Sequence, residues 1–195
     1  LDTVDQPGVS VQVSWHGPSI GLDDKATYVA DVFSYIITQQ QHRFEQALVE
    51  SGLAQRAGFG YYTQRYVGPI SASLFVTPMK LDTAMKVFWR EVAKFADTNY
   101  YTREEFETSK NYLRTETMYR SVKLSDFAQD IGFWWSTAGL DYYEHYLEDL
   151  SKITRQDITD YVRRYIQGQP YVLGMAMSKP AAIITEPSLK RYGRP

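Results

Sequence analysis

The sequence contains no cysteine, which excludes disulfide bonds, thiolate zinc sites, iron–sulfur clusters and cysteine nucleophiles. Histidine is scarce, with three residues in 195, namely His16, His42 and His145. No apolar run reaches the roughly 18 residues that suggest a membrane span. The formal net charge is only -2, from 21 Lys and Arg against 23 Asp and Glu, so there is no strong overall field to bind nucleic acid. Thiol, membrane-spanning and nucleic-acid functions are therefore disfavoured.

What is present is a composition typical of a folded domain. Hydrophobic residues make up 44% of the chain and aromatic residues 15%, with 12 Gly and 8 Pro. This content argues against disorder and against collagen-like repeats, and the length favours one domain. We expect a single domain over residues 1–195, with a lead-in at 1–8 and a tail at 180–195. Because the chain begins with Leu1 and not Met, we expect it to be a processed or excised part of a longer protein.

Four segments have the patterns of β-strands. Apolar and polar residues alternate over 9–15, which predicts a half-buried strand. The same period of two recurs in 59–63 and 70–76, on either side of a Gly68-Pro69 turn, and predicts an antiparallel hairpin. Residues 171–177 form a final apolar strand.

The remainder of the chain has mostly helical spacing. Helices are predicted at 24–40, 42–50, 82–95, 102–138 with a break near 121–125, 140–150 and 154–168. Thr102 with Glu105, and Thr154 with Asp157, have the spacing of capping boxes. The order of elements predicts an α+β fold, with a largely antiparallel sheet and helices packed on one face.

Motifs for chemistry are nearly absent. There is no P-loop, no G-x-G-x-x-G and no G-x-S-x-G. Asp141, Glu144 and His145 match the inverted zinc motif H-x-x-E-H except that Asp replaces the first His. A chance match in an acidic, tyrosine-rich helix explains this spacing better. The residues therefore identify no catalytic, substrate-binding or metal-binding site.

A set of collinear segments does carry a resemblance. HRFEQALVESGLAQRA at 42–57, Thr77-Pro78, YTREEFETSKNYL at 101–113 and ITRQDI at 153–158 follow one another as in the pitrilysin/insulinase-type (M16) zinc peptidases. The matching pieces extend over about residues 42–178. The chain resembles the C-terminal-type, non-catalytic half-domain of that family. The resemblance implies an α+β half-domain that pairs with a half-domain carrying H-x-x-E-H.

Some half-domains of this type supply an Arg and a Tyr that help to bind substrate. Here Val49 stands where the Arg would be and Gln55 where the Tyr would be, in a segment one residue shorter. Arg56 and Tyr61 or Tyr62 could replace them, but the register does not support it. No substrate residue is therefore carried over.

The resemblance implies a non-catalytic domain of a zinc metallopeptidase, which packs against a zinc-bearing half-domain and forms part of the peptide chamber. The chain alone is expected to be inactive, and zinc is expected only in the partner half-domain. The alternative is a structural or assembly module of a peptidase-like protein that has lost activity. A third hypothesis is a self-contained metalloenzyme using Asp141, Glu144 and His145. The first two predict an exposed apolar or aromatic docking patch, and a bacterial periplasm or cell envelope is compatible with the family.

Overall fold

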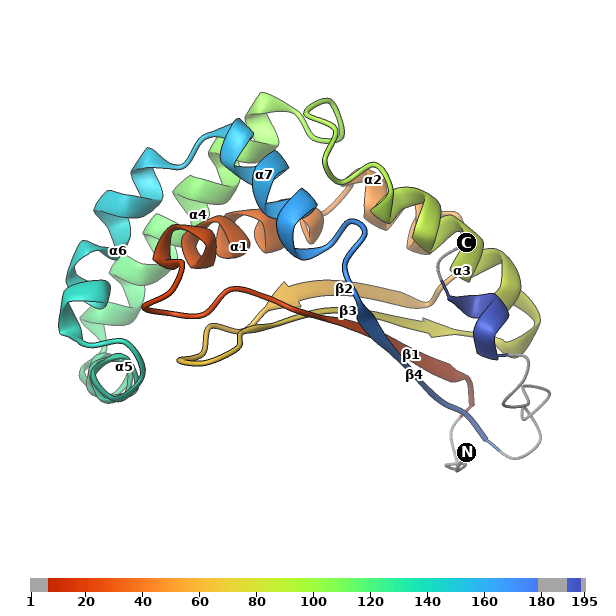
Figure 1. Cartoon of the computed structure of the whole chain (residues 1–195), viewed down its shortest axis with the longest axis horizontal. Helices are drawn as coiled ribbons and strands as arrows, with labels where there is room; N and C mark the ends of the chain where they lie inside the picture. Colours follow the sequence, from red (N-terminus) through yellow and green to blue (C-terminus); the bar gives the residue numbers. More distant parts are fainter. Residues whose placement is uncertain (1–6, 179–188, 194–195) are drawn as a thin grey trace.

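A four-stranded antiparallel sheet forms one layer of the protein in the computed structural model, which describes residues 7–178 and 189–193 (Figure 1). Its strands are β1 (Val9–His16), β2 (Arg56–Tyr61), β3 (Pro69–Val76) and β4 (Tyr171–Ala176). They lie in the order β2-β3-β1-β4, and every neighbouring pair is antiparallel. The predicted hairpin is confirmed, although β2 begins three residues before the predicted start.

Most of the helices form the second layer, on one face of the sheet, and α5 lies beyond one end of the sheet (Figure 1). They are α1 (Asp24–Ile37), α2 (Arg43–Glu45), α3 (Leu81–Val92), α4 (Arg103–Val122), α5 (Leu124–Thr137), α6 (Leu140–Lys152) and α7 (Arg155–Tyr165). The described residues also form a π-helical turn η1 (Gln46–Glu50) and the 3-10 turns η2 (Pro78–Lys80) and η4 (Lys190–Tyr192). The predicted α+β class is confirmed. None of the helices within the described ranges is long and apolar enough to cross a bilayer.

The core lies between these two layers. Alternate strand residues such as Val11, Ile70 and Leu74 point toward the helices and are almost completely buried. Phe33 of α1 is fully buried and makes edge-on ring contacts with Phe59 and other aromatic residues of the core. Burial of a large apolar side chain stabilises a fold by about 1.5–3 kcal/mol, so these alternating residues fix which face of the sheet the helices cover.

The helix ends follow the sequence closely. Thr102 and Thr154 each accept a hydrogen bond from the backbone three residues on, and both capping boxes are complete. Lys123 has an extended backbone, so α4 and α5 are separate helices, as predicted by the break near 121–125. The helix predicted to reach Phe95 ends at Val92, because the backbone amides of Lys94 and Phe95 bond three residues back and form tighter turns.

The segment after β4 contacts the helical layer. Tyr192 is buried, and its carbonyl oxygen accepts a hydrogen bond from Nε1 of Trp89 in α3 at 2.8 Å. Arg191 forms an ion pair with Asp82 of the same helix. Residues 189–193 of the predicted tail therefore pack on α3, whereas 180–188, 194–195 and residues 1–6 of the predicted lead-in lie outside the described residues.

Candidate functional site on the uncovered sheet face

The face of the sheet that points away from the helices carries small side chains. Residues that pair across neighbouring strands and point away from the helices form four rows across the sheet. Each row contains one residue from each strand that extends to it. Three complete rows run from β2 through β3 and β1 to β4: Arg56–Phe75–Ser10–Ala176, Gly58–Ser73–Gln12–Gly174 and Gly60–Ser71–Ser14–Val172. We call these twelve residues the outer face.

The outer face is hollowed rather than filled. A groove of about 630 Å³ crosses all four strands near one end of the sheet. At Gly58 an added Cβ would lie 2.9 Å from Oγ of Ser73, so glycine keeps this part of the groove open. The guanidinium of Arg56 lies 5.3 Å from the ring centre of Phe75 and marks one end of the groove.

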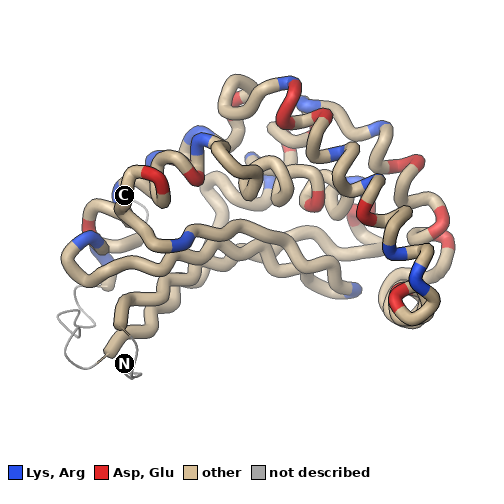
Figure 2. Tube along the Cα trace, turned by 180° about the vertical axis from the view of Figure 1, so that it is seen from behind, with Lys and Arg blue, Asp and Glu red and all other residues tan. Residues whose placement is uncertain are grey.

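Charge is concentrated in the helical layer (Figure 2). Within the four strands, Arg56 is the sole Lys, Arg, Asp or Glu. The outer face therefore offers hydroxyl groups, a Gln amide, exposed backbone and one guanidinium. Such a surface can contact an extended chain or another protein, but it holds no pair of groups for acid–base catalysis.

An exposed apolar corner lies where α4 meets α5. The side chains of Tyr119, Val122 and Leu124 are 78%, 81% and 79% exposed, and Met118 is 54% exposed. We call these four residues the apolar corner. Apolar side chains gathered in this way commonly mark contacts with other proteins.

The three histidines lie in three different settings. His16 is exposed at the end of β1, whereas His42 is fully buried and its Nδ1 accepts a hydrogen bond from the backbone of Phe44 at 3.2 Å. Burial lowers the pKa of His42. His145 is exposed, and a hydrogen bond to the carbonyl of Asp141 raises its pKa.

The metalloenzyme hypothesis requires Asp141, Glu144 and His145 to lie together as metal ligands. Asp141, Glu144 and His145 all lie in α6, and the structure does not assemble them into a metal-binding group. Over residues 7–178 and 189–193, no three His, Asp or Glu side chains come together as zinc ligands would.

The possible replacements for the family's Arg and Tyr do not converge either. Arg56 and Tyr61 stand at opposite ends of β2 and on opposite faces, because Arg56 pairs with Phe75 and Tyr61 with the inward-facing Ile70. The hydroxyl of Tyr61 donates to the carbonyl of Pro18 at 2.9 Å. Tyr62 follows the strand and is 56% exposed.

A comparison of sequences decides the family. The family model described as the peptidase M16 inactive domain matches residues 1–113. The chain belongs to this family. No curated protein matches the chain in sequence. This match confirms the resemblance to the M16 family that residues 42–178 predict. It also confirms that the chain is of the family's non-catalytic domain type.

Solved structures share the fold of this M16 inactive domain. A protease from Helicobacter pylori is 14% identical with a TM-score of 0.79, over 90% of this chain and 43% of that chain. The inactive peptidase domain of a candidate zinc protease from Bordetella parapertussis is 14% identical with a TM-score of 0.76, over 91% of this chain and 95% of that chain. A chain of complex III2 from Candida albicans, with Inz-5 bound, is 11% identical with a TM-score of 0.72, over 98% of this chain and 48% of that chain. The M16 inactive domain thus spans less than half of the first and third of these proteins and nearly all of the second.

Proposed function

We propose that this M16 inactive domain is a non-catalytic part of a zinc metallopeptidase and that its outer face forms part of the wall of the peptide chamber. The observation that carries the proposal is a sheet covered by helices on one face only. Its other face consists mostly of Ser, Gly and Ala with a groove of about 630 Å³. Small side chains leave room for a peptide beside the sheet, and their hydroxyl groups suit polar contacts with it.

The partner is a zinc-bearing half-domain of the same or a second chain. Two features support this part of the proposal. The domain spans 43% of the Helicobacter pylori protease, so more than half of that protein lies outside the matching region. The apolar corner gives the partner a surface to bury, because Val122 and Leu124 are about four-fifths exposed. Zinc and the residues that activate water are then supplied by the partner.

The first experiment prepares this domain with its H-x-x-E-H half-domain and measures zinc content and peptide cleavage. We expect no cleavage by the domain alone, and cleavage with zinc in the assembled protein. Ser73→Trp fills the groove from an exposed position, and we expect it to lower kcat/KM at least about tenfold without preventing assembly. Thr83→Trp, on an exposed site of α3, is the matched control and should leave cleavage unchanged.

A separate experiment tests whether the apolar corner binds the zinc-bearing half-domain. Val122→Asp places a charge in the apolar corner, and we expect it to weaken assembly, measured by analytical ultracentrifugation. Thr115→Asp, at an exposed position of the same helix, is the control. Full cleavage by the zinc-bearing half-domain without this domain, or equal cleavage with Ser73→Trp, would contradict the proposal.

A second candidate function is that of a structural or assembly module. The similarity to a chain of complex III2 from Candida albicans favours it, because that chain belongs to an assembled complex. The same preparation distinguishes the two functions. A stable assembly that contains no zinc and cleaves no peptide supports the module, whereas zinc-dependent cleavage supports the peptidase.

A further inference from the structure

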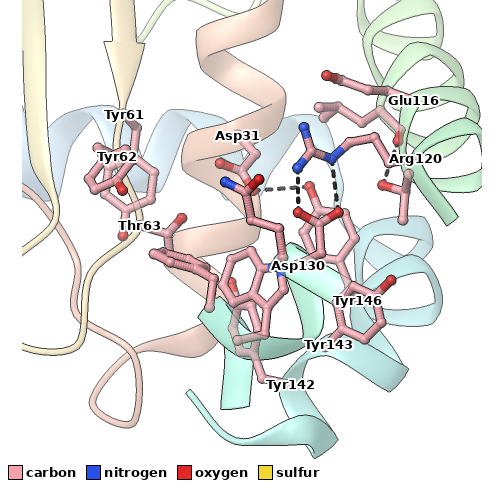
Figure 3. A pocket seen from close by; sticks show the side chains of 15 residues that line it. Asp31, Tyr61, Tyr62, Thr63, Glu116, Arg120, Asp130, Tyr142, Tyr143 and Tyr146 are labelled. Carbon is pink, nitrogen blue, oxygen red and sulfur yellow. Dashed lines mark hydrogen bonds and ion pairs between the residues drawn. The ribbon is translucent and has the colours of Figure 1, made fainter. Parts of the chain in front are cut away.

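A second cavity lies on the helical side of the sheet and shares no lining residue with the outer face. Its volume is about 400 Å³, and its lining comes from α1, α4, α5, α6 and the residues at the end of β2 (Figure 3). Asp31 of α1 and Tyr61 and Tyr62 at the end of β2 border the same space as Asp130 of α5. We call this cavity the aromatic pocket.

Aromatic rings form much of the wall of the aromatic pocket. Seven of them line it: Tyr61, Tyr62, Phe133, Trp134, Tyr142, Tyr143 and Tyr146. Trp134 stacks on Tyr142 with ring centres 5.1 Å apart, and Phe133 contacts Tyr62 at 6.3 Å. These contacts hold the rings in place. The face of an aromatic ring attracts cations, with guanidinium groups preferred over ammonium groups.

The charged side chains of the aromatic pocket leave an excess of negative charge. Asp31, Glu116 and Asp130 line it together with a single basic residue, Arg120. Arg120 is engaged by Asp130, to which its Nε donates a hydrogen bond at 2.9 Å. Among the residues that the structure describes, neither Asp31 nor Glu116 has an ion-pair partner. Two carboxyl groups are therefore available to a cation.

The carboxyl group of Asp31 is buried and surrounded by titratable groups of the same protein. Its Oδ2 accepts a hydrogen bond from the hydroxyl of Tyr146 at 3.0 Å. Burial, with a smaller effect of the nearby Glu116, raises the pKa of Asp31 to about 7. The titratable and charged groups that face it come from five helices and one strand: Tyr28 (α1), Tyr61 (β2), Glu116 and Arg120 (α4), Asp130 (α5), Tyr142 and Tyr146 (α6) and Tyr161 (α7). An incoming cation would favour the ionised form.

We propose that the aromatic pocket binds an organic cation, a guanidinium group carried on a flexible chain, between its aromatic rings and the carboxylates of Asp31 and Glu116. The guanidinium is planar, stacks on rings and pairs with carboxylates through two hydrogen bonds. A metal ion is not the proposed ligand, because Asp31, Glu116 and Asp130 are not grouped closely enough among the described residues to hold one. This inference is independent of the proposed function, since the pocket is complete within this chain.

The test is isothermal titration calorimetry on the chain at about pH 8, where Asp31 is ionised. Three probes are used: N-acetyl-arginine amide for an arginine within a peptide, the monocationic butylguanidine for a guanidinium compound outside a peptide, and N-acetyl-citrulline amide as a neutral analogue of the first. We expect saturable binding of the guanidinium probes and at least about tenfold weaker binding of the citrulline probe. Tighter binding of the arginine amide than of butylguanidine, which has the same charge, identifies a peptide source, and the reverse order identifies a guanidinium compound outside a peptide.

Two variants assign the binding to the aromatic pocket. Asp31→Asn preserves shape and removes charge, and we expect about tenfold weaker binding; Asp141→Asn, an exposed carboxyl on α6, is the charge-matched control and should bind as the unmodified chain does. Tyr62→Leu removes an exposed ring without altering the core, and should weaken binding severalfold even if Asp31→Asn fails to fold. Absence of saturable binding, equal binding of the citrulline probe, or full affinity in folded Asp31→Asn or in Tyr62→Leu overturns the proposal.

Discussion

The carboxyl group of Asp31 should make the stability of the protein fall as pH rises. Burial raises its pKa from 3.8 to about 7 in the folded protein. Between these values the folded chain binds more protons than the unfolded chain. The free energy of unfolding therefore decreases with increasing pH through this window. Asp31→Asn cannot titrate, so the variant should lack this part of the pH dependence while it keeps an acceptor for the hydroxyl of Tyr146.

The size of the effect follows from the two pKa values. A pKa difference of about three units corresponds to about 4 kcal/mol when the carboxyl is fully ionised in both states. Part of this free energy is already lost at about pH 5, where the unfolded carboxyl is ionised. Between about pH 5 and about pH 8 the remaining change is about 3 kcal/mol. The variant should thus gain this much stability relative to the unmodified chain over that interval.

Urea unfolding followed by tryptophan fluorescence at both pH values measures this difference. The quantity compared is the change in the free energy of unfolding between the two pH values, and not its value at a single pH. An Asn amide without a hydrogen-bond partner would lower the free energy of unfolding by the same amount at both pH values, so it does not affect this change. Asp141→Asn serves as the control, since Asp141 is exposed on α6. Parallel behaviour of Asp31→Asn and the unmodified chain, within about 0.5 kcal/mol, would refute the argument that Asp31 is desolvated.

Three further predictions concern the fold. Phe33→Ala should lower the free energy of unfolding by about 3–5 kcal/mol, because the ring is fully buried among other rings; a loss below about 1 kcal/mol in urea unfolding would contradict this. Thr102→Ala should lower the free energy of unfolding by about 1 kcal/mol, because it removes the side-chain oxygen that accepts a hydrogen bond from the backbone of Glu105. The helical circular dichroism signal should therefore be lost at a lower temperature than in the unmodified chain. Gly68→Ala should lower the melting temperature by several degrees, because the added methyl overlaps the ring of Tyr61; an unchanged temperature would show that the ring can move aside.

Local patterns were sufficient to predict most of the elements. Alternation over 9–15 predicts β1 because its odd residues, such as Val11 and Val13, face the helices. The caps at Thr102 and Thr154 involve bonds within four residues, so sequence alone determines them. The absence of charge from three of the four strands also agrees with their burial on one face. Predictions of this kind depend on neighbours in the chain and require no tertiary information.

The aromatic pocket could not be predicted in the same way. Its lining is drawn from residues 31 to 146, and only tertiary packing brings them together. The sequence offers one signal: Asp31 is the sole Asp, Glu, Lys or Arg between Lys25 and Arg43, in the middle of a predicted helix. The sequence does not predict the burial of His42 either, because its environment is made partly by Tyr100, whose ring lies 5.3 Å away but 58 positions later in the chain. Spacing along the sequence carries no information about such contacts.

The position of β1 at the centre of the sheet has a consequence for synthesis on the ribosome. Its neighbours are β3 and β4, and the β4 pairing joins Ser10 to Ala176 and Trp15 to Tyr171. An early-made strand must therefore wait with one edge unpaired until almost the whole described chain has emerged. At about 5–20 residues per second that interval is on the order of ten seconds. During this interval the unpaired edge of β1 exposes backbone hydrogen-bond donors and acceptors that can pair with strands of other chains. Protection by chaperones therefore matters most before β4 is made.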